Sequence, residues 1–280
     1  MIKKIFIVIL SWSSFYHLYA QNFANPDTVT VPSDRLQLKA LLWRPTGSPP
    51  FPAIIFCHGS YESNDTSYDP VRQISSIAPI FANNGYIFFG LLRRGVGLSK
   101  GQGENSADLM ANAFKQKGND ERSKVQLQQL TTTQLQDMVA GLTFLRKRSD
   151  VDSNRIAIIG HSFGGSLSLL LAEHEHSIKA VIVFGAAGYS WNRSPQLRER
   201  LISSVKNITA PIMLVHAEND YSTKPGYVID SLLNQPGKTH ILKIYPKFGN
   251  SQREGHNMIF LNPPTWEGDV LEFLDKNLQH

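Results

Sequence analysis

Residues 155–165 read RIAIIGHSFGG, and this stretch decides the fold. A continuously apolar run, Ile156–Ile159, leads into the pattern Gly-X-Ser-X-Gly, and an apolar segment with helical spacing follows. Such a run is typical of a strand buried on both faces of a parallel sheet. Gly160 and Gly164 leave room for a sharp strand-to-helix turn, which lifts the hydroxyl of Ser162 above the sheet. The stretch therefore predicts a buried strand that ends in an exposed, reactive serine.

Outward from this turn, short apolar runs alternate with segments of helical periodicity. Strands are predicted at Thr28–Val31, Leu36–Trp43, Ala53–Cys57, Tyr86–Leu92, Ile156–Ile159, Ala180–Phe184, Ile212–Val215 and Ile241–Tyr245. Helices are predicted at Val71–Ala82, Thr133–Arg148, Gly164–Ala172, Pro225–Leu233 and Thr265–Leu278. The first two strands form an antiparallel pair, and the proline-rich Pro45–Pro52 is a connector outside the sheet. The alternation predicts an α/β fold, a three-layer α/β/α sandwich with a mostly parallel sheet of about eight strands and helices on both faces.

The first twenty residues have the layout of a signal peptide. Lys3 and Lys4 precede the apolar run Ile5–Leu10, and Ala20 offers a small residue for cleavage. The alternatives are a buried strand or an uncleaved anchor, although the run is short for a membrane span. We expect residues 1–20 to be removed and residues 21–280 to form one domain, periplasmic or secreted.

Composition narrows the class of protein. Hydrophobic residues make up 41% and charged residues 18% of the 280 residues, which is a globular balance. The net charge of +5 falls to +3 without the two leader lysines, and the remaining basic residues are dispersed, so nucleic acid is not an expected partner. No second apolar segment reaches membrane-spanning length, and we expect no stable membrane insertion of the mature chain. The single cysteine, Cys57, allows no internal disulfide and lies in an apolar run, where we expect an inert thiol.

One long segment interrupts the alternation of strands and helices. Gly101–Gln129 is rich in Asn, Gln, Lys, Asp and Ser, and we expect a polar excursion over the surface. Two interpretations stay open: a plain solvated loop, or a segment that covers the substrate.

A serine hydroxyl needs a base to accept its proton, and His256 has the expected position among the nine histidines. It lies after the last predicted strand and before the final helix, where a side chain can reach back over the sheet. The competing interpretation is an exposed loop histidine without a catalytic role. We therefore predict that His256 is the general base for Ser162.

The acid that orients this base is expected between the two residues, at the carboxyl end of a strand. Asp220 meets both conditions, since it follows the strand that ends at Val215. Glu218 is the nearest rival, and Asp230 falls inside a predicted helix. We predict Asp220 as the acid, with Glu218 as the alternative.

Negative charge that develops on a substrate oxygen needs hydrogen-bond donors. The Phe163 N–H at the start of the helix after Ser162 is the first expected donor. A second donor is expected from the loop after Ala53–Cys57, where Gly59 permits a tight turn; the Ser60 N–H is preferred and Tyr61 is the alternative. A simple turn at this place is the competing interpretation.

With these residues in place, the chain resembles the α/β-hydrolase superfamily over nearly all of its mature length. The resemblance rests on the order Ser162, Asp220, His256 and on the loop His58–Gly59. Within the superfamily, Leu92–Ser99 and Leu214–Asp220 resemble the dienelactone-hydrolase-like and prolyl-oligopeptidase-like branch. That branch implies a serine hydrolase. Dienelactone hydrolases proper carry cysteine in place of Ser162, and prolyl oligopeptidases carry a large propeller for which Gln21–Pro50 is too short.

Three functions follow as alternatives. The first is an esterase that cleaves small carboxylic esters through an acyl-enzyme; the others are a peptidase for short peptides and a binding module without catalysis. No metal or organic cofactor is expected. Glu173–His176 is a weak metal candidate, because adjacent residues point in different directions around a helix end. Arg93 and Arg94 could hold a substrate carboxylate, but a structural or solvated role is the preferred interpretation. The oligomeric state is left open.

Overall fold

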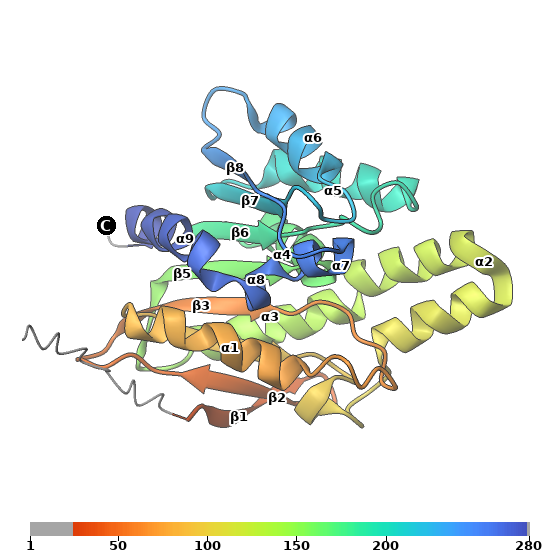
Figure 1. Ribbon diagram of the computed structural model, residues 1–280. Coiled ribbons are helices and arrows are strands. Elements are labelled where there is room, and N and C mark those ends of the chain that lie inside the picture. Colours follow the sequence, from red (N-terminus) through yellow and green to blue (C-terminus); the bar gives the residue numbers. More distant parts are fainter. Residues whose placement is uncertain (1–24, 279–280) are drawn as a thin grey trace, which may run out of the picture.

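The structure, a computed structural model, describes residues 25–278 and is built on one twisted sheet (Figure 1). The strands are β1 (Asp27–Ser33), β2 (Leu36–Trp43), β3 (Phe51–Cys57), β4 (Ile87–Leu92), β5 (Val151–His161), β6 (Ala180–Phe184), β7 (Ile212–Ala217) and β8 (His240–Tyr245). Their order in the sheet is β1-β2-β4-β3-β5-β6-β7-β8. β2 runs antiparallel to both neighbours, and the strands from β4 to β8 are parallel. The predicted fold class is confirmed.

Helices cover both faces of the sheet. They are α1 (Pro70–Asn83), α2 (Ser106–Thr131), α3 (Thr133–Arg146), α4 (Phe163–His174), α5 (Pro195–Asn207), α6 (Lys224–Leu233), α7 (Gln252–His256), α8 (Met258–Leu261) and α9 (Pro263–Leu278), with a 3₁₀ turn η1 at Gly97–Ser99. One buried cluster joins the sheet to α1, α8 and α9, and a second joins it to α3, α4, α5 and α6. The apolar strands are therefore buried on both faces, as their composition requires.

The structure differs from the sequence prediction at the start of β3 and in three additional helices. The connector predicted at Pro45–Pro52 ends earlier, because β3 begins at Phe51, which pairs with Val151. The register shifts before Ala53, which removes Pro52, a residue without an N–H, from the ladder. Helices α5, α7 and α8 were not predicted.

The segment Gly101–Gln129 differs most. Instead of an irregular excursion it is mainly α2, which is interrupted at Gly118, where φ is 76°. Asn105 caps the helix by accepting from the N–H groups of Ala107 and Asp108. Gln, Lys and Glu favour helices without adding apolar periodicity, so the sequence pattern of this segment does not indicate a helix. Figure 1 shows the two arms of α2 projecting beyond the carboxyl ends of the central strands, where the candidate site lies.

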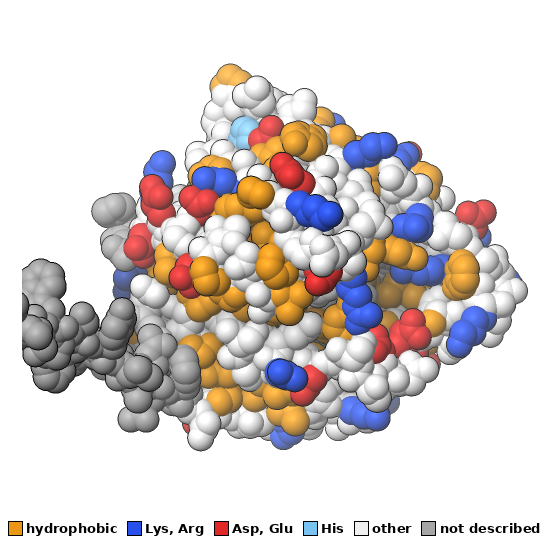
Figure 2. Space-filling model, viewed as in Figure 1, with side chains coloured by type: hydrophobic (Ala, Val, Ile, Leu, Met, Phe, Trp, Pro, Cys, Tyr) orange, Lys and Arg blue, Asp and Glu red, His pale blue; other side chains and the backbone are white. Residues whose placement is uncertain are grey.

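The remaining predictions concern surface charge, membrane spans and the signal peptide. Basic and acidic side chains are interspersed on the face shown in Figure 2, without an extended patch of one sign. Within residues 25–278 no helix is long and apolar enough to cross a membrane. The predicted signal peptide, with cleavage near Ala20, lies outside the described residues.

Candidate active site

Ser162 occupies the sharp turn between β5 and α4. Its backbone has φ 57° and ψ −117°, a conformation that is strained for a residue with a side chain. A Cβ on Gly160 would collide with Ser168 and with the Gly164 carbonyl, and one on Gly164 would collide with the Cys57 carbonyl. Both glycines are therefore required by close backbone packing, as the sequence predicted.

The structure brings the three predicted side chains together in a chain of hydrogen bonds. His256, the last residue of α7, places its Nε2 2.8 Å from Ser162 Oγ. Its Nδ1 lies 2.6 Å from Asp220 Oδ1, in the loop after β7. Glu218, the alternative acid, is exposed, and Asp230 on α6 pairs with His240 instead. Among the acids considered, Asp220 is the one in contact with His256.

Asp220 is buried, yet its surroundings favour the charged carboxylate. Burial by itself raises the pKa of this carboxyl, but the adjacent His256 and His216 rings hold the pKa below its usual range. His216 Nδ1 lies 2.8 Å from Oδ2, and the Tyr221 N–H donates to Oδ1 at 2.6 Å. A carboxylate fixed at both oxygens can hold the His256 ring in one orientation.

Two histidines in this network were not predicted as site residues. His216 donates to Asp220, and Gly226 makes room for it, since a Cβ there would lie 2.9 Å from its ring. His161 Nε2 lies 2.9 Å from the His256 carbonyl oxygen, and burial lowers the pKa of His161 to about 3. His161 was visible as the residue before Ser162, but no sequence signal tied it to the His256 backbone.

The predicted oxyanion loop lies directly against this turn. Gly59, Ser60 and Tyr61 line the same cavity as Ser162 and Phe163. A Cβ on Gly59 would lie 3.3 Å from His161 Nδ1 and 3.6 Å from the Cβ of Ser162, so this loop packs closely against the turn. The Tyr61 ring is buried against His58 and Tyr68, with ring centroids 5.7 and 5.4 Å away. Ser60 and Phe163 therefore lie on the wall of the cavity that holds Ser162.

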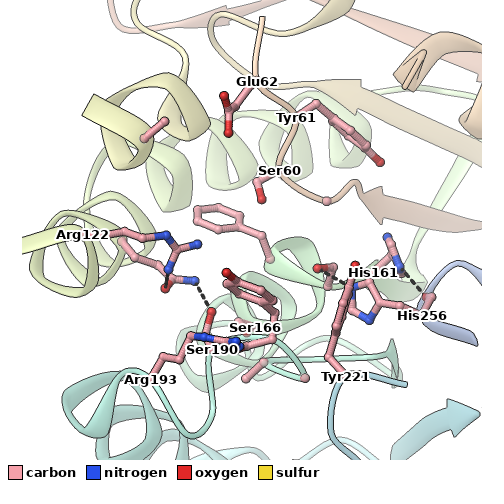
Figure 3. A pocket seen from close by; sticks show the side chains of 18 of the residues that line it. Ser60, Tyr61, Glu62, Arg122, His161, Ser166, Ser190, Arg193, Tyr221 and His256 are labelled. Atoms are coloured by element: carbon pink, nitrogen blue, oxygen red, sulfur yellow. Dashed lines mark hydrogen bonds between the residues drawn. The ribbon is translucent and has the colours of Figure 1, made fainter. Parts of the chain in front are cut away.

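The cavity in front of Ser162 has a volume of about 690 Å³. Its walls come from the loop after β3, from α2, and from the loops after β6 and β7. From α2 it receives Ala111, Phe114, Lys115, Asn119, Arg122 and Gln126. Figure 3 shows Arg122 and Arg193 on the side of the cavity away from His256, with Ser60, Tyr61 and Glu62 along the upper wall. The site is thus a polar and aromatic cavity of a size that suits a small organic molecule.

The sequence model of the dienelactone hydrolase family matches residues 38–258, which is most of the chain and includes every residue of this constellation. The chain belongs to the dienelactone hydrolase family.

The sequence relatives of the chain include cutinases, which fits its membership of a hydrolase family. Cutinase 2 of Thermobifida cellulosilytica is 32% identical over 99 residues, which are 35% of this chain and 38% of the cutinase. The chain therefore matches little more than a third of that relative's length.

Solved structures share the architecture. The acylaminoacyl peptidase of Pyrococcus horikoshii superposes with a TM-score of 0.62 and 19% identity, over 90% of this chain and 42% of that chain. A dienelactone hydrolase from Anabaena variabilis superposes with a TM-score of 0.60 and 18% identity, over 91% of this chain and all of that chain, 100%. At these identities the likeness shows the fold, which is that of the α/β-hydrolases, as the sequence resemblance implied.

The other residues that the sequence offered as candidates contact other side chains or are buried. Glu173 binds Arg200 and Asn207, and within residues 25–278 no group of three or more His, Cys, Asp or Glu side chains is arranged to hold a metal. Arg94 forms an ion pair with buried Asp137. Cys57 is buried, and burial raises the pKa of its thiol to about 11.

Proposed function

We propose that this chain is a serine hydrolase that cleaves small carboxylic esters through an acyl-enzyme on Ser162. The observation that carries the proposal is the continuous path of two short hydrogen bonds, 2.8 Å from Ser162 to His256 and 2.6 Å from His256 to Asp220. This order of nucleophile, base and orienting acid is what acyl transfer requires. Within the hydrolase class it favours covalent catalysis by serine, with no metal and no organic cofactor.

In the proposed reaction, Ser162 Oγ attacks the ester carbonyl carbon while His256 Nε2 accepts the hydroxyl proton. The N–H groups of Phe163 and Ser60, with Tyr61 as the alternative second donor, stabilise the negative oxygen of the tetrahedral intermediate. Collapse of the intermediate breaks the bond to the alcohol, which leaves with the proton from His256. Water then attacks the acyl-enzyme, gives its proton to Nε2, and the carboxylic acid departs as the proton returns to Ser162. Asp220 stays ionised and stabilises the imidazolium throughout.

Substitution of the nucleophile tests this proposal. Ser162→Ala is expected to lower kcat for short aryl esters by roughly 10⁴-fold or more, while Ser76→Ala on α1, a matched change away from the site, keeps wild-type turnover. Retained turnover in Ser162→Ala would refute the assignment and would favour a binding module without this chemistry.

A serine peptidase is the second candidate. The fold shared with acylaminoacyl peptidase supports it, although that protein is matched over only 42% of its chain. A matched pair of substrates, an N-acyl amino acid ester and the corresponding amide, separates the two activities. Ester cleavage with at least 10³-fold slower amide cleavage supports the esterase; comparable kcat/KM values would make the peptidase the better description.

The cavity wall favours esters that carry a negative charge. Arg122 and Arg193 both lie against the Tyr189 ring, with Cζ 5.3 and 4.0 Å from its centroid. Neither side chain forms an ion pair within the described residues. Burial lowers the pKa of Arg122, and the nearby Glu62 carboxylate on the same wall offsets part of that effect. A partly buried cation such as Arg122 attracts an anionic ligand, and the exposed Arg193 adds a second positive charge to the same wall. An ester with a carboxylate on its acyl or alcohol part therefore fits this wall.

Paired esters test this preference. A 4-nitrophenyl half-ester of succinic acid should show a lower KM than 4-nitrophenyl acetate, and Arg122→Gln or Arg193→Gln should reduce the difference several-fold. Arg155→Gln, on a surface pair with Asp152, is the control. An unchanged KM ratio in both pocket variants contradicts the preference.

The signal-peptide layout supports export of the enzyme to the periplasm or the medium, with small esters or short peptides as its substrates there. Mass spectrometry of the exported protein tests this: a new N-terminus near Gln21 is expected, and a full-length protein in the cytoplasm contradicts it.

A further inference from the structure

Two buried side chains converge on the carbonyl oxygen of Gly59, the residue before the preferred oxyanion donor. His58 Nδ1 lies 2.7 Å from this oxygen and Arg93 Nη2 lies 3.0 Å from it. The same His58 ring accepts the backbone N–H of Arg93 on Nε2, at 3.2 Å. Because Nε2 accepts, the ring proton is on Nδ1, which donates to the Gly59 oxygen. Both nitrogens of a neutral imidazole are thus used.

The surroundings of His58 agree with a neutral ring. Burial and the nearby charge of Arg93 hold the pKa of His58 well below its ordinary value. His58 therefore keeps this single tautomer at neutral pH, and its role is to hold backbone groups rather than to transfer protons.

Arg93 is a buried cation without an acid partner. Its side chain is 1% exposed, and its Nε donates to Gln134 at 2.8 Å. The nearby Asp137 is occupied by Arg94 and Ser33. Burial lowers the pKa of Arg93 to about 10, so the guanidinium stays charged at neutral pH. A buried charge that no carboxylate contacts directly lowers the stability of the fold, and such charges are concentrated at functional sites.

The Gly59 carbonyl and the Ser60 N–H belong to one planar peptide group, so contacts that fix the carbonyl also fix the direction of the N–H. This peptide bond is trans, since the single cis bond of the described chain joins Pro49 to Pro50. In a trans peptide the carbonyl oxygen and the N–H point to opposite sides of the chain. When Arg93 and His58 hold the Gly59 oxygen in the protein interior, the Ser60 N–H is directed away from them.

We propose that Arg93 and His58 are positioning residues that fix the Gly59–Ser60 peptide with the Ser60 N–H aimed at the substrate oxygen. This inference rests on the proposed function. Hydrogen bonds to the Gly59 oxygen also polarise the amide, which makes the Ser60 N–H a stronger donor. The Arg93 guanidinium also lies over the Phe163 ring, with Cζ 5.5 Å from the ring centroid.

A comparison of esters with thionoesters isolates this effect. Sulfur in place of the carbonyl oxygen weakens the hydrogen bonds that stabilise the tetrahedral intermediate, so the wild-type enzyme should strongly prefer the oxygen ester. Arg93→Gln should lower kcat for the oxygen ester by about 10-fold to 10²-fold, because a misaligned donor loses much of its contribution. KM should stay within about two-fold, and the ratio of ester to thionoester rates should fall by a similar factor to kcat.

Two further variants make the test specific. Arg93→Lys keeps the positive charge, but an ammonium group cannot contact Gln134 and the Gly59 carbonyl with the geometry of the guanidinium. We therefore expect an intermediate ratio of ester to thionoester rates. This variant also supplies the measurement if Arg93→Gln does not fold. Arg94→Gln makes the same change at the neighbouring residue and removes the contact with Asp137. It should lower thermal stability and leave the ratio unchanged.

The outcomes separate this inference from the proposed function. If the wild-type protein hydrolyses esters through Ser162 and both Arg93 variants keep the wild-type ratio, the positioning role is wrong and the function stands. If Ser162→Ala retains wild-type turnover, both are overturned. A ratio that falls in the Arg93 variants and not in Arg94→Gln supports the positioning role.

Discussion

Asp220 accepts three N–H donors, and this arrangement predicts the effect of replacing its carboxylate by an amide. Oδ1 accepts from His256 and from the Tyr221 backbone, whereas Oδ2 accepts from His216 alone. In Asp220→Asn, the amide nitrogen should take the Oδ2 position, where it meets one donor instead of two. His216 can then change its tautomer, and His256 keeps its proton on Nδ1 and its unprotonated Nε2 as the acceptor for Ser162.

The expected loss is therefore that of the charge alone. A carboxylate about 4 Å from an imidazolium, at an effective dielectric constant of about 20, contributes about 4 kcal/mol. This corresponds to a fall in kcat of about 10³-fold. An amide that forced His256 into the opposite tautomer would lower kcat by about 10⁴-fold.

Steady-state hydrolysis of an aryl ester at pH 7 measures this loss, with Glu218→Gln as the matched control. Glu218 is exposed two residues earlier in the same loop, and its conversion to an amide should leave kcat within about two-fold. The reasoning is refuted if Asp220→Asn loses less than 10-fold, or if Glu218→Gln loses as much.

Three further predictions follow from packing, titration and the cavity wall. Gly164→Ala should destabilise the protein by about 2 kcal/mol or more, because the new methyl group collides with backbone carbonyls at the end of β3; urea unfolding that matches wild type would contradict this. His161→Gln should reduce the dependence of stability on pH. The pKa of His161 is lowered to about 3 in the folded state, so between its ordinary value of 6.5 and about 3 the unfolded chain binds the extra proton and wild-type stability falls as pH falls. The contribution is at most about 1.4 kcal/mol per pH unit, and equal slopes in urea titrations of both proteins at pH 4.5–7 would refute it. Phe114→Ala should raise KM for bulky aryl esters a few-fold without changing Tm, since Phe114 is 54% exposed and lines the cavity; an altered Tm with unchanged KM would assign it a structural role instead.

The sequence was sufficient to predict the sheet and the turn at Ser162, because both depend on local patterns. The buried strands are continuously apolar, and Gly160 and Gly164 are needed wherever a strand turns this sharply into a helix. The same local logic placed His256 and Asp220 after the last strands. Their mutual distances required the folded chain.

Other features depend on tertiary contacts that no local pattern encodes. The polar segment Gly101–Gln129 has helix-forming residues but weak apolar periodicity, so its contribution to the cavity wall was visible only in the structure. His216 lies in a buried strand, where a histidine by itself indicates no partner. The role proposed for Arg93 needs the loops after β3 and β4 to meet at the Gly59 carbonyl group, and the spacing of these residues in the sequence does not indicate that contact.

Labelling with an active-site phosphonate tests the central claim most directly. The reagent transfers its phosphorus to an activated serine oxygen, and peptide mass spectrometry then locates the modified residue. We predict one phosphonyl group per folded molecule, on Ser162, with loss of esterase activity in the same proportion. A label on another residue of the folded protein, or complete labelling with full activity retained, would contradict the account.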